Sequence, residues 1–179
     1  FGLRPVTDRV TFIIDRSTSM EAPFAKTGAS RYAEAARQMA QFLRDLGPQT
    51  RFRVVLFDSA LHIWKDQLQI ANTTNVGAAS AWISYQRPLG GTVLRTAVES
   101  VLRLRSDGTL DMRKLEEDTV IVLCDGATTD GPSWVEGLIE RVGSQACVVF
   151  HCVQIGSSGD GTLELLAKLT GGDFVRVDG

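Results

Sequence analysis

Three short segments of this chain carry residue types that can bind a metal ion through oxygen. The first, Asp15-Arg16-Ser17-Thr18-Ser19, directly follows an apolar run, and so does Asp125-Gly126. Between them, Gly90-Gly91-Thr92 precedes a segment with helical spacing. Ligands of open α/β sheets bind outside the carboxyl ends of the strands, so we expect the three segments to meet at one edge of a sheet. The candidate ligands are Asp15, Ser17, Ser19, Thr92 and Asp125.

Two carboxylates and three hydroxyls make an all-oxygen set of ligands, which suits a hard divalent cation. We expect magnesium, with manganese or calcium able to take its place. Neutral hydroxyl ligands do not cancel the charge of the cation, so an open coordination position would favour an anionic oxygen from outside. Such a site recognises a partner's carboxylate and has no need of catalytic groups.

The elements that must position these residues alternate between short apolar runs and amphipathic segments, which is typical of βαβ units. The apolar runs predict buried strands over residues 10–14, 54–57, 120–124, 147–155 and 174–177. The spacing of apolar residues predicts helices over residues 32–46, 94–102, 133–142 and 163–169. The third helix opens with Ser133-Trp134-Val135-Glu136, which predicts a capping box.

One element breaks this alternation. The stretch between Phe57 and Leu61 is too short for a helical crossover, so residues 61–65 are predicted to fold back as an antiparallel edge strand. The fold class is therefore α/β: a Rossmann-like, three-layer αβα arrangement with a six-stranded, mostly parallel sheet and helices on both faces. We expect one domain over residues 1–179, excised from a larger protein, with residues 106–118 as a polar surface excursion.

Composition excludes several classes of partner. The formal net charge is −2 and the basic residues near position 105 alternate with acidic ones, so we expect no nucleic-acid binding. No apolar run approaches the roughly 20 residues that cross a bilayer, so we expect no membrane insertion by this domain. We expect a monomer, and the sequence predicts no localisation. Cys124, Cys147 and Cys152 lie in apolar, strand-like runs and are predicted to be buried, inert thiols.

Asp15-x-Ser17-x-Ser19 followed by Met20, together with Gly90-Gly91-Thr92 and Asp125-Gly126, resembles the von Willebrand factor type A (VWA) domain and its metal-ion-dependent adhesion site (MIDAS). The order of elements and the antiparallel edge resemble that family over nearly the whole chain. The resemblance implies that Ser17, Ser19 and Thr92 bind the ion directly, and that Asp15 and Asp125 bind it directly or through water. It implies an adhesion-type, cation-dependent protein-interaction module whose last metal ligand is an Asp or Glu of a protein partner.

One position departs from the common pattern. Many members of the family have Gly where this chain has Thr18. If the position requires a positive φ, a β-branched Thr would be strained there.

Other interpretations remain open at this stage. Asp15 and Asp125 are also residue types favoured in turns and helix caps. The chain is alternatively a scaffolding VWA domain that binds partners through a metal-independent surface. A magnesium-dependent, phosphatase-like hydrolase also places an Asp after its first strand, but the second carboxylate that it needs two residues later is Ser17 here. His62 and His151 are isolated in the sequence, and no phosphate-binding loop is present, so we expect no enzyme.

Overall fold

The computed structural model describes residues 8–177, whose strands form one sheet with a mostly parallel core. The strand order is β3-β2-β1-β5-β6-β7. Strand β4 pairs with the first residues of β2, whereas β3 pairs with its last residues. The central strands β2, β1, β5, β6 and β7 are parallel to one another, whereas β3 and β4 run antiparallel to β2. The strand bounds are β1 Arg9–Asp15, β2 Arg51–Phe57, β3 Leu61–Ile63, β4 Gln69–Ile70, β5 Thr119–Cys124, β6 Val149–Ile155 and β7 Phe174–Val177.

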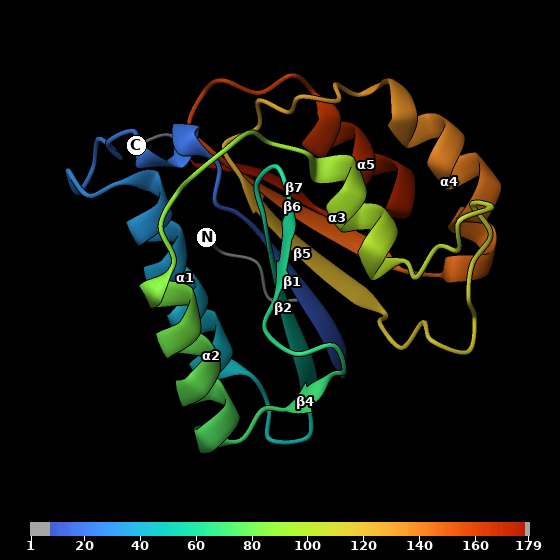
Figure 1. Cartoon of the computed structure of the whole chain (residues 1–179), viewed down its shortest axis with the longest axis horizontal. Coiled ribbons are helices and arrows are strands. Elements are labelled where there is room, and N and C mark those ends of the chain that lie inside the picture. Colours follow the sequence, from blue (N-terminus) through green and yellow to red (C-terminus); the bar gives the residue numbers. More distant parts are fainter. Residues whose placement is uncertain (1–7, 178–179) are drawn as a thin grey trace.

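Helices cover both faces of the sheet, which gives the three layers predicted from the sequence. Helices α1 and α2 lie on one side, and α3, α4 and α5 lie on the other (Figure 1). The helix bounds are α1 Arg31–Asp45, α2 Thr73–Tyr85, α3 Leu94–Val101, α4 Ser133–Ala146 and α5 Thr162–Thr170, and a short 3-10 helix η1 spans Thr18–Glu21. The α/β class, the parallel sheet with an antiparallel edge and the four predicted helices are therefore confirmed.

The strands are apolar on both faces because both faces are covered. Phe12 and Ile14 of β1 pack in the core below α1 and α2, whereas Ile13 between them packs in the core below α3, α4 and α5. All three side chains are fully buried. This arrangement explains the nearly unbroken apolar run in the sequence, because alternation with polar residues appears only where one face meets solvent.

Three elements were not predicted: the 3-10 helix η1, helix α2 and strand β4. Helix α2 buries only Ala79 and Ile83 and is otherwise rich in small residues, so its apolar residues show no helical period. Its start had a local signal, because the side chain of Asn72 accepts a hydrogen bond from the N–H of Asn75 at 2.8 Å, as an N-cap residue does. Strand β4 is two residues long and adds a seventh strand to the six that were predicted.

Three local predictions at helix α4 and beyond it were wrong. No side chain caps α4, because the residue before Ser133, Pro132, already has helical backbone angles. Cys147 is exposed and belongs to no strand, because it ends α4 in a left-handed conformation with φ at 50°. Strand β6 therefore begins at Val149. Cys124 and Cys152 are buried, as predicted.

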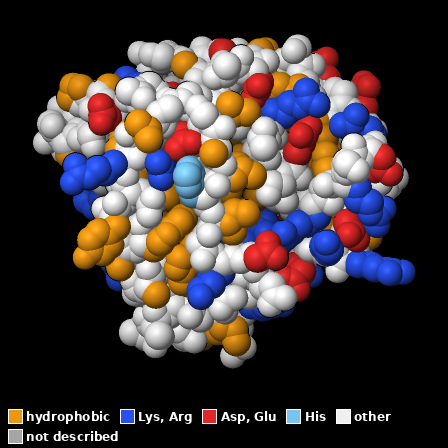
Figure 2. Space-filling model, in the orientation of Figure 1, with side chains coloured by type: hydrophobic (Ala, Val, Ile, Leu, Met, Phe, Trp, Pro, Cys, Tyr) orange, Lys and Arg blue, Asp and Glu red, His pale blue; other side chains and the backbone are white. Residues whose placement is uncertain are grey.

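The surface has mixed charge. The face shown in Figure 2 carries acidic side chains among its basic ones, with apolar side chains between them. Among the helices of residues 8–177, none combines the length and the apolar character that crossing a membrane requires.

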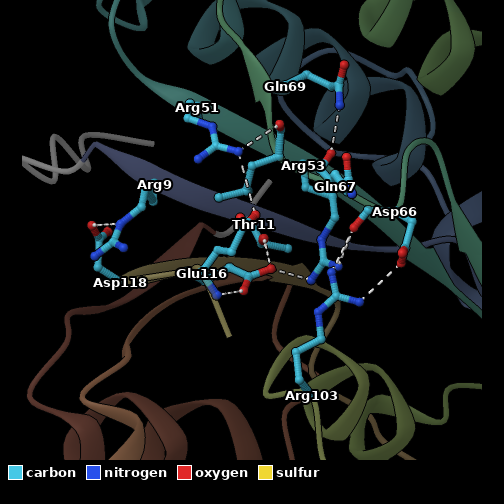
Figure 3. A network of polar contacts seen from close by, with 12 residues as sticks. Arg9, Thr11, Arg51, Arg53, Asp66, Gln67, Gln69, Arg103, Glu116 and Asp118 are labelled. Carbon is cyan, nitrogen blue, oxygen red and sulfur yellow. Dashed lines mark hydrogen bonds and ion pairs between the residues drawn. The ribbon is translucent and has the colours of Figure 1, made fainter. Parts of the chain in front are cut away.

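A buried charge network fixes the end of the sheet where the parallel strands begin (Figure 3). Arg53 of β2 forms an ion pair with Glu117, and both side chains are almost completely inaccessible to solvent. The hydroxyl of Thr11 donates to the same carboxylate at 3.2 Å. Arg53 and Arg103 both donate to the carbonyl oxygen of Asp66, at 3.1 and 2.7 Å. The network thus ties the loop after β3 and the segment before β5 to the middle of the sheet.

Part of the predicted surface excursion over residues 106–118 is consequently internal. Glu117 is 4% exposed and Leu110 is 6% exposed, so both belong to the interior. The polar composition of this segment was misleading because Glu117 has a buried cationic partner, Arg53. Charged side chains are found inside proteins when they have such a partner.

Substituting Glu117→Gln should lower the free energy of unfolding by about 3–5 kcal/mol, because it leaves the buried guanidinium of Arg53 without a counter-charge. Denaturant unfolding measures the effect. The matched control is Arg95→Gln, which removes the Arg95–Glu99 pair on α3, where Arg95 is half exposed. We expect that change to cost about 0.5 kcal/mol or less.

The double variant Arg53→Met/Glu117→Leu should recover most of the lost stability, because apolar side chains of similar volume often replace a buried ion pair without loss. Equal, small effects of Glu117→Gln and Arg95→Gln would show that the network does not stabilise the sheet.

Candidate metal centre

The two candidate aspartates lie together because they end adjacent parallel strands. In the β1–β5 pairing, Ile14 lies opposite Leu123, so Asp15 and Asp125 leave the sheet at the same edge. Asp15 is 0% exposed and Asp125 is 1% exposed. Carboxylate oxygens of the two residues lie within 4.8 Å of each other. The edge therefore holds two buried carboxylates at a distance where like charges repel strongly.

The serines are brought to Asp15 by the turn that follows β1. The N–H of Ser17 donates to Oδ1 of Asp15 at 2.7 Å, and the hydroxyls of Ser17 and Ser19 lie 3.0 Å apart. The fully buried side chain of Met20 anchors η1 in the core below α1. Thr18 does not have a positive φ, so the strain considered for this position is absent.

Thr92 lies in a loop that is hydrogen-bonded to both of the other segments. Gly90 accepts, through its carbonyl oxygen, from the N–H and from the hydroxyl of Thr18, each at 3.1 Å. On the other side, the carbonyl oxygen of Thr92 accepts from the N–H of Thr129 at 2.9 Å. Thr92 itself is 7% exposed. The structure thus holds the Thr92 loop between the segment after β1 and the segment after β5.

Gly90 is required by this arrangement. Its φ is +76°, and a Cβ atom there would lie 2.9 Å from the hydroxyl oxygen of Ser59. Both facts exclude larger residues, because a left-handed backbone and a close approach are each tolerated best by glycine. That hydroxyl also accepts from the N–H of Gly91 at 2.8 Å, which ties the loop to the end of β2.

Asp15 has an unfavourable environment for its charge. Burial raises the pKa of Asp15 to about 6, with a smaller contribution in the same direction from the charge of Asp125. Hydrogen bonds from Ser17 and from the thiol of Cys124, whose Sγ lies 3.0 Å from Oδ2, act against this increase. These hydrogen bonds do not fully offset the effect of burial, so a nearby cation would stabilise the ionised carboxylate of Asp15.

Asp125 has one oxygen paired and one unpaired. Its Oδ2 lies 3.3 Å from Nη1 of Arg31, at the start of α1. Its Oδ1 is buried and has no hydrogen-bond partner among the described residues. A buried carboxylate oxygen without a partner is costly, and a coordinated cation satisfies it. The donor set at this edge, two carboxylates and nearby hydroxyls, therefore fits a hard divalent ion.

The remaining strand-end acids have other roles. Asp58 pairs with Nε of Arg16 at 2.9 Å and with Nε2 of His62 at 3.2 Å. Asp160 accepts hydrogen bonds from Thr128 and Thr162 and so orders the start of α5. His62 is thus not isolated in space, but its partner is an aspartate already held by Arg16, and no nucleophile is hydrogen-bonded to it within residues 8–177.

Asp130 and Arg16 form hydrogen bonds and ion pairs within the loops around the centre. Asp130 accepts the N–H of Arg95 at 3.3 Å, in the first turn of α3. Arg16, which lies between the candidate ligands Asp15 and Ser17, forms an ion pair with Asp58 and donates to the side-chain oxygen of Gln86.

Two residues of the centre were missed by the sequence reasoning. Arg31 lies 94 positions from Asp125, and no local pattern connects them. Cys124 was interpreted as an inert core thiol, although its position directly before Asp125 in the strand places it beside Asp15.

Comparison with known proteins gives a consistent family. Residues 8–175 match the model of the von Willebrand factor type A domain. The chain is 29% identical over 132 residues to inter-alpha-trypsin inhibitor heavy chain H1 of Sus scrofa, and 24% identical over 170 residues to heavy chain H4 of Homo sapiens. These alignments cover 73% and 94% of this chain but only 14% and 18% of the relatives.

Solved structures share the fold. A von Willebrand factor type A structure from Catenulispora acidiphila superposes with a TM-score of 0.74 at 20% identity, over 96% of this chain and 39% of that one. Proximal thread matrix protein 1 from the mussel byssus, described with a zinc-occupied MIDAS motif, superposes with a TM-score of 0.62 at 19% identity, over 94% of this chain and 41% of that one.

The environment of Asp15 predicts a specific dependence of stability on pH in metal-free buffer. A carboxyl whose pKa is raised from 3.8 to about 6 on folding binds its proton more tightly in the folded state. The contribution of the Asp15 carboxyl to the free energy of unfolding is therefore zero well below pH 4. It becomes unfavourable as the pH rises and is complete above pH 6, where it lowers the free energy of unfolding by about 3 kcal/mol. Asp15→Asn should accordingly stabilise the metal-free protein at pH 7 and not at pH 3.5 or below.

Denaturant unfolding at a series of pH values checks this expectation. Asp45→Asn, on the exposed face of α1, is the matched control and should follow the wild type at each pH. A difference between Asp15→Asn and wild type that does not change between pH 3.5 and pH 7 would contradict the argument.

Proposed function

This chain belongs to the von Willebrand factor type A family, and we propose that it is a divalent-cation-dependent protein-interaction module that binds an acidic side chain of its partner. The observation that carries the proposal is the buried pair of Asp15 and Asp125, whose charges are not balanced by the described residues around them. In this proposal the ion supplies the missing positive charge, and its remaining coordination position takes an Asp or Glu carboxylate of the partner.

The roles of the individual residues follow from their chemistry. Ser17, Ser19 and Thr92 would bind the ion through neutral hydroxyls, which leave it electron-poor and therefore attractive to an incoming carboxylate. Asp15 and Asp125 would hold it directly or through water. Ser19 is the exposed member of the set, whereas Asp15, Ser17 and Asp125 are buried. An ion placed among them would thus be reached from the side of the 3-10 helix η1.

The hydrogen bonds around the centre support a rigid arrangement of these ligands. The N–H of Leu89 donates to the carbonyl oxygen of Arg16 at 2.7 Å, and the N–H of Thr18 donates to Gly90 at 3.1 Å. The segment after β1 and the Thr92 loop would therefore move together. Preorganised ligands favour tight binding because little conformational freedom is lost when the ion enters.

Magnesium is the ion we propose, with manganese or calcium as substitutes. The five candidate ligands are all oxygens, which these ions prefer. The zinc named for the mussel protein belongs to that protein, and it supports only the general point that a divalent ion fits this motif in a related fold.

Membership of this family argues against catalysis by the domain. The matched relatives are inter-alpha-trypsin inhibitor heavy chains, of which this chain spans less than a fifth. We propose that this domain supplies a binding surface, without enzymatic activity, to whatever assembly it serves. A metal-independent surface is the alternative, and partner capture in the presence and absence of a chelator separates the two.

Saturating magnesium should raise the melting temperature of the domain. At a hundred times the dissociation constant, binding to the folded state adds about 2.7 kcal/mol. For a domain of this size the increase corresponds to roughly 5–10 °C. Ser19→Ala should reduce the increase, whereas Ser84→Ala, at an exposed position of α2, should retain it. Absence of magnesium, manganese and calcium binding by calorimetry at millimolar concentration would end the proposal.

Partner capture by the immobilised domain should depend on the same ion. Proteins retained in magnesium should be released by a chelator, and they should not be retained by Asp15→Ala or Thr92→Ala. The control is Thr96→Ala, an exposed threonine of α3 close in sequence to Thr92. Retention that survives both the chelator and the Asp15→Ala substitution would establish the metal-independent surface instead.

A further inference from the structure

Cys124 lies at the metal centre as well as in the core. Its Sγ atom and a carboxylate oxygen from each of Asp15 and Asp125 lie within 4.8 Å of one another. The thiol donates to Oδ2 of Asp15 at 3.0 Å, and it accepts from the N–H of Gly126 at 3.3 Å. A sulfur atom is therefore placed among the two acids that the proposed function uses.

A second observation in the same cluster points to a ligand. Oδ1 of Asp125 is buried and has no hydrogen-bond partner among the described residues. Residues so nearly inaccessible normally satisfy every polar atom, so this oxygen needs a donor or a cation. The cluster thus contains one potential sulfur ligand and an unsatisfied oxygen ligand side by side.

We propose that Asp15, Cys124 and Asp125 form a binding site for a thiophilic divalent cation, of the class of zinc, cobalt and cadmium. The metal–sulfur bond forms as the Sγ–H bond breaks and its proton leaves to solvent, with no change in oxidation state. Zinc binds sulfur at about 2.3 Å and carboxylate oxygen at about 2.0–2.2 Å, so neighbouring ligand atoms on one ion lie roughly 3–4 Å apart. The 3.0 Å between the thiol and Asp15 fits this spacing.

The thiol distinguishes between classes of cation. The thiol of Cys124 donates a hydrogen bond to Oδ2 of Asp15, so in this arrangement it carries its proton. Magnesium and calcium have little affinity for sulfur and leave the proton in place. A thiophilic ion gains a strong bond when it displaces that proton, so the same centre takes hard ions through oxygen and soft ions through sulfur.

The charges of the cluster support occupation by a dication. With the thiol ionised, the three ligands carry three negative charges. The guanidinium of Arg31, 3.3 Å from Oδ2 of Asp125, supplies one positive charge. A divalent ion supplies the other two, so the buried cluster becomes neutral, which is the condition for burying charges at low cost.

This inference rests on the proposed function only in that Asp15 and Asp125 are metal ligands in both. Because those two ligands are shared, a thiophilic ion and magnesium exclude each other from the centre. Bound zinc would therefore displace the hard ion and block the coordination position proposed for a partner's carboxylate.

Cobalt titration of the whole chain tests the sulfur ligand directly. A cobalt–thiolate bond produces a charge-transfer band in the near ultraviolet that oxygen ligands do not produce. The exposed Cys147 is removed in every sample by Cys147→Ser, and the buried Cys152 is kept in all of them. We expect the band in Cys147→Ser and its loss in Cys124→Ser/Cys147→Ser, with zinc affinity lowered at least about 100-fold.

Magnesium binding by the double variant separates the two proposals. Retained magnesium binding together with loss of the cobalt band supports the sulfur ligand. A cobalt band that persists without Cys124, or that is absent from Cys147→Ser while magnesium binds normally, overturns the sulfur ligand and leaves the proposed function intact.

A measurement without any change at position 124 covers the case in which the double variant does not fold. The cadmium NMR shift of cadmium-loaded Cys147→Ser reports whether sulfur is bound, because sulfur ligands move the resonance far from the range of oxygen ligands. A shift typical of oxygen ligands alone would overturn the proposal.

Discussion

The burial of two neighbouring carboxylates is the constraint around which this end of the molecule is built. Asp15 and Asp125 are brought together because they follow the last residue pair of β1 and β5, and both side chains are buried. The surrounding groups each offset part of the cost of burying these charges: the N–H of Ser17 and the thiol of Cys124 at Asp15, and the guanidinium of Arg31 at Asp125. Burial outweighs these contacts, and the charge of Asp125 adds a smaller effect in the same direction, so the pKa of Asp15 is raised although hydrogen-bonding groups contact the pair.

The layers of the fold were predictable because they depend on periodicity, which a single sequence contains. The run from Val10 to Ile14 predicted a strand covered on both faces, and the spacing of apolar residues over 32–46 predicted a helix. Strand β2 was predicted too short because Arg53 interrupts its apolar run. A buried arginine is recognisable only through its partner, and Glu117 lies 64 positions away in a segment whose composition is polar. Helix α2 was missed for the related reason that small residues produce no period.

The candidate site was likewise predicted only in part from the sequence. Asp15, Asp125 and the loop of Thr92 were predicted to share one edge because parallel strands place their carboxyl ends together, and the structure has this arrangement. Arg31 and Cys124 were not assigned to the site, since their roles depend on which side chains face each other across α1, β1 and β5. The positions of these residues in the sequence predicted which edge of the sheet holds the site. The charge balance at that edge could be recognised only from the three-dimensional contacts.

The two ends of the sheet solve the problem of buried charge differently, and the difference bears on function. Where the parallel strands begin, the buried carboxylate of Glu117 is matched by the buried guanidinium of Arg53, and the carbonyl oxygen of Asp66 joins Arg53 to Arg103 (Figure 3). Where they end, two acids face a single guanidinium. A fold under selection for stability alone would favour the matched arrangement at both ends, because an unmatched buried charge lowers the free energy of unfolding. An unmatched edge is instead the arrangement expected of a site whose missing charge arrives with a ligand, since buried groups with perturbed pKa values cluster at functional sites.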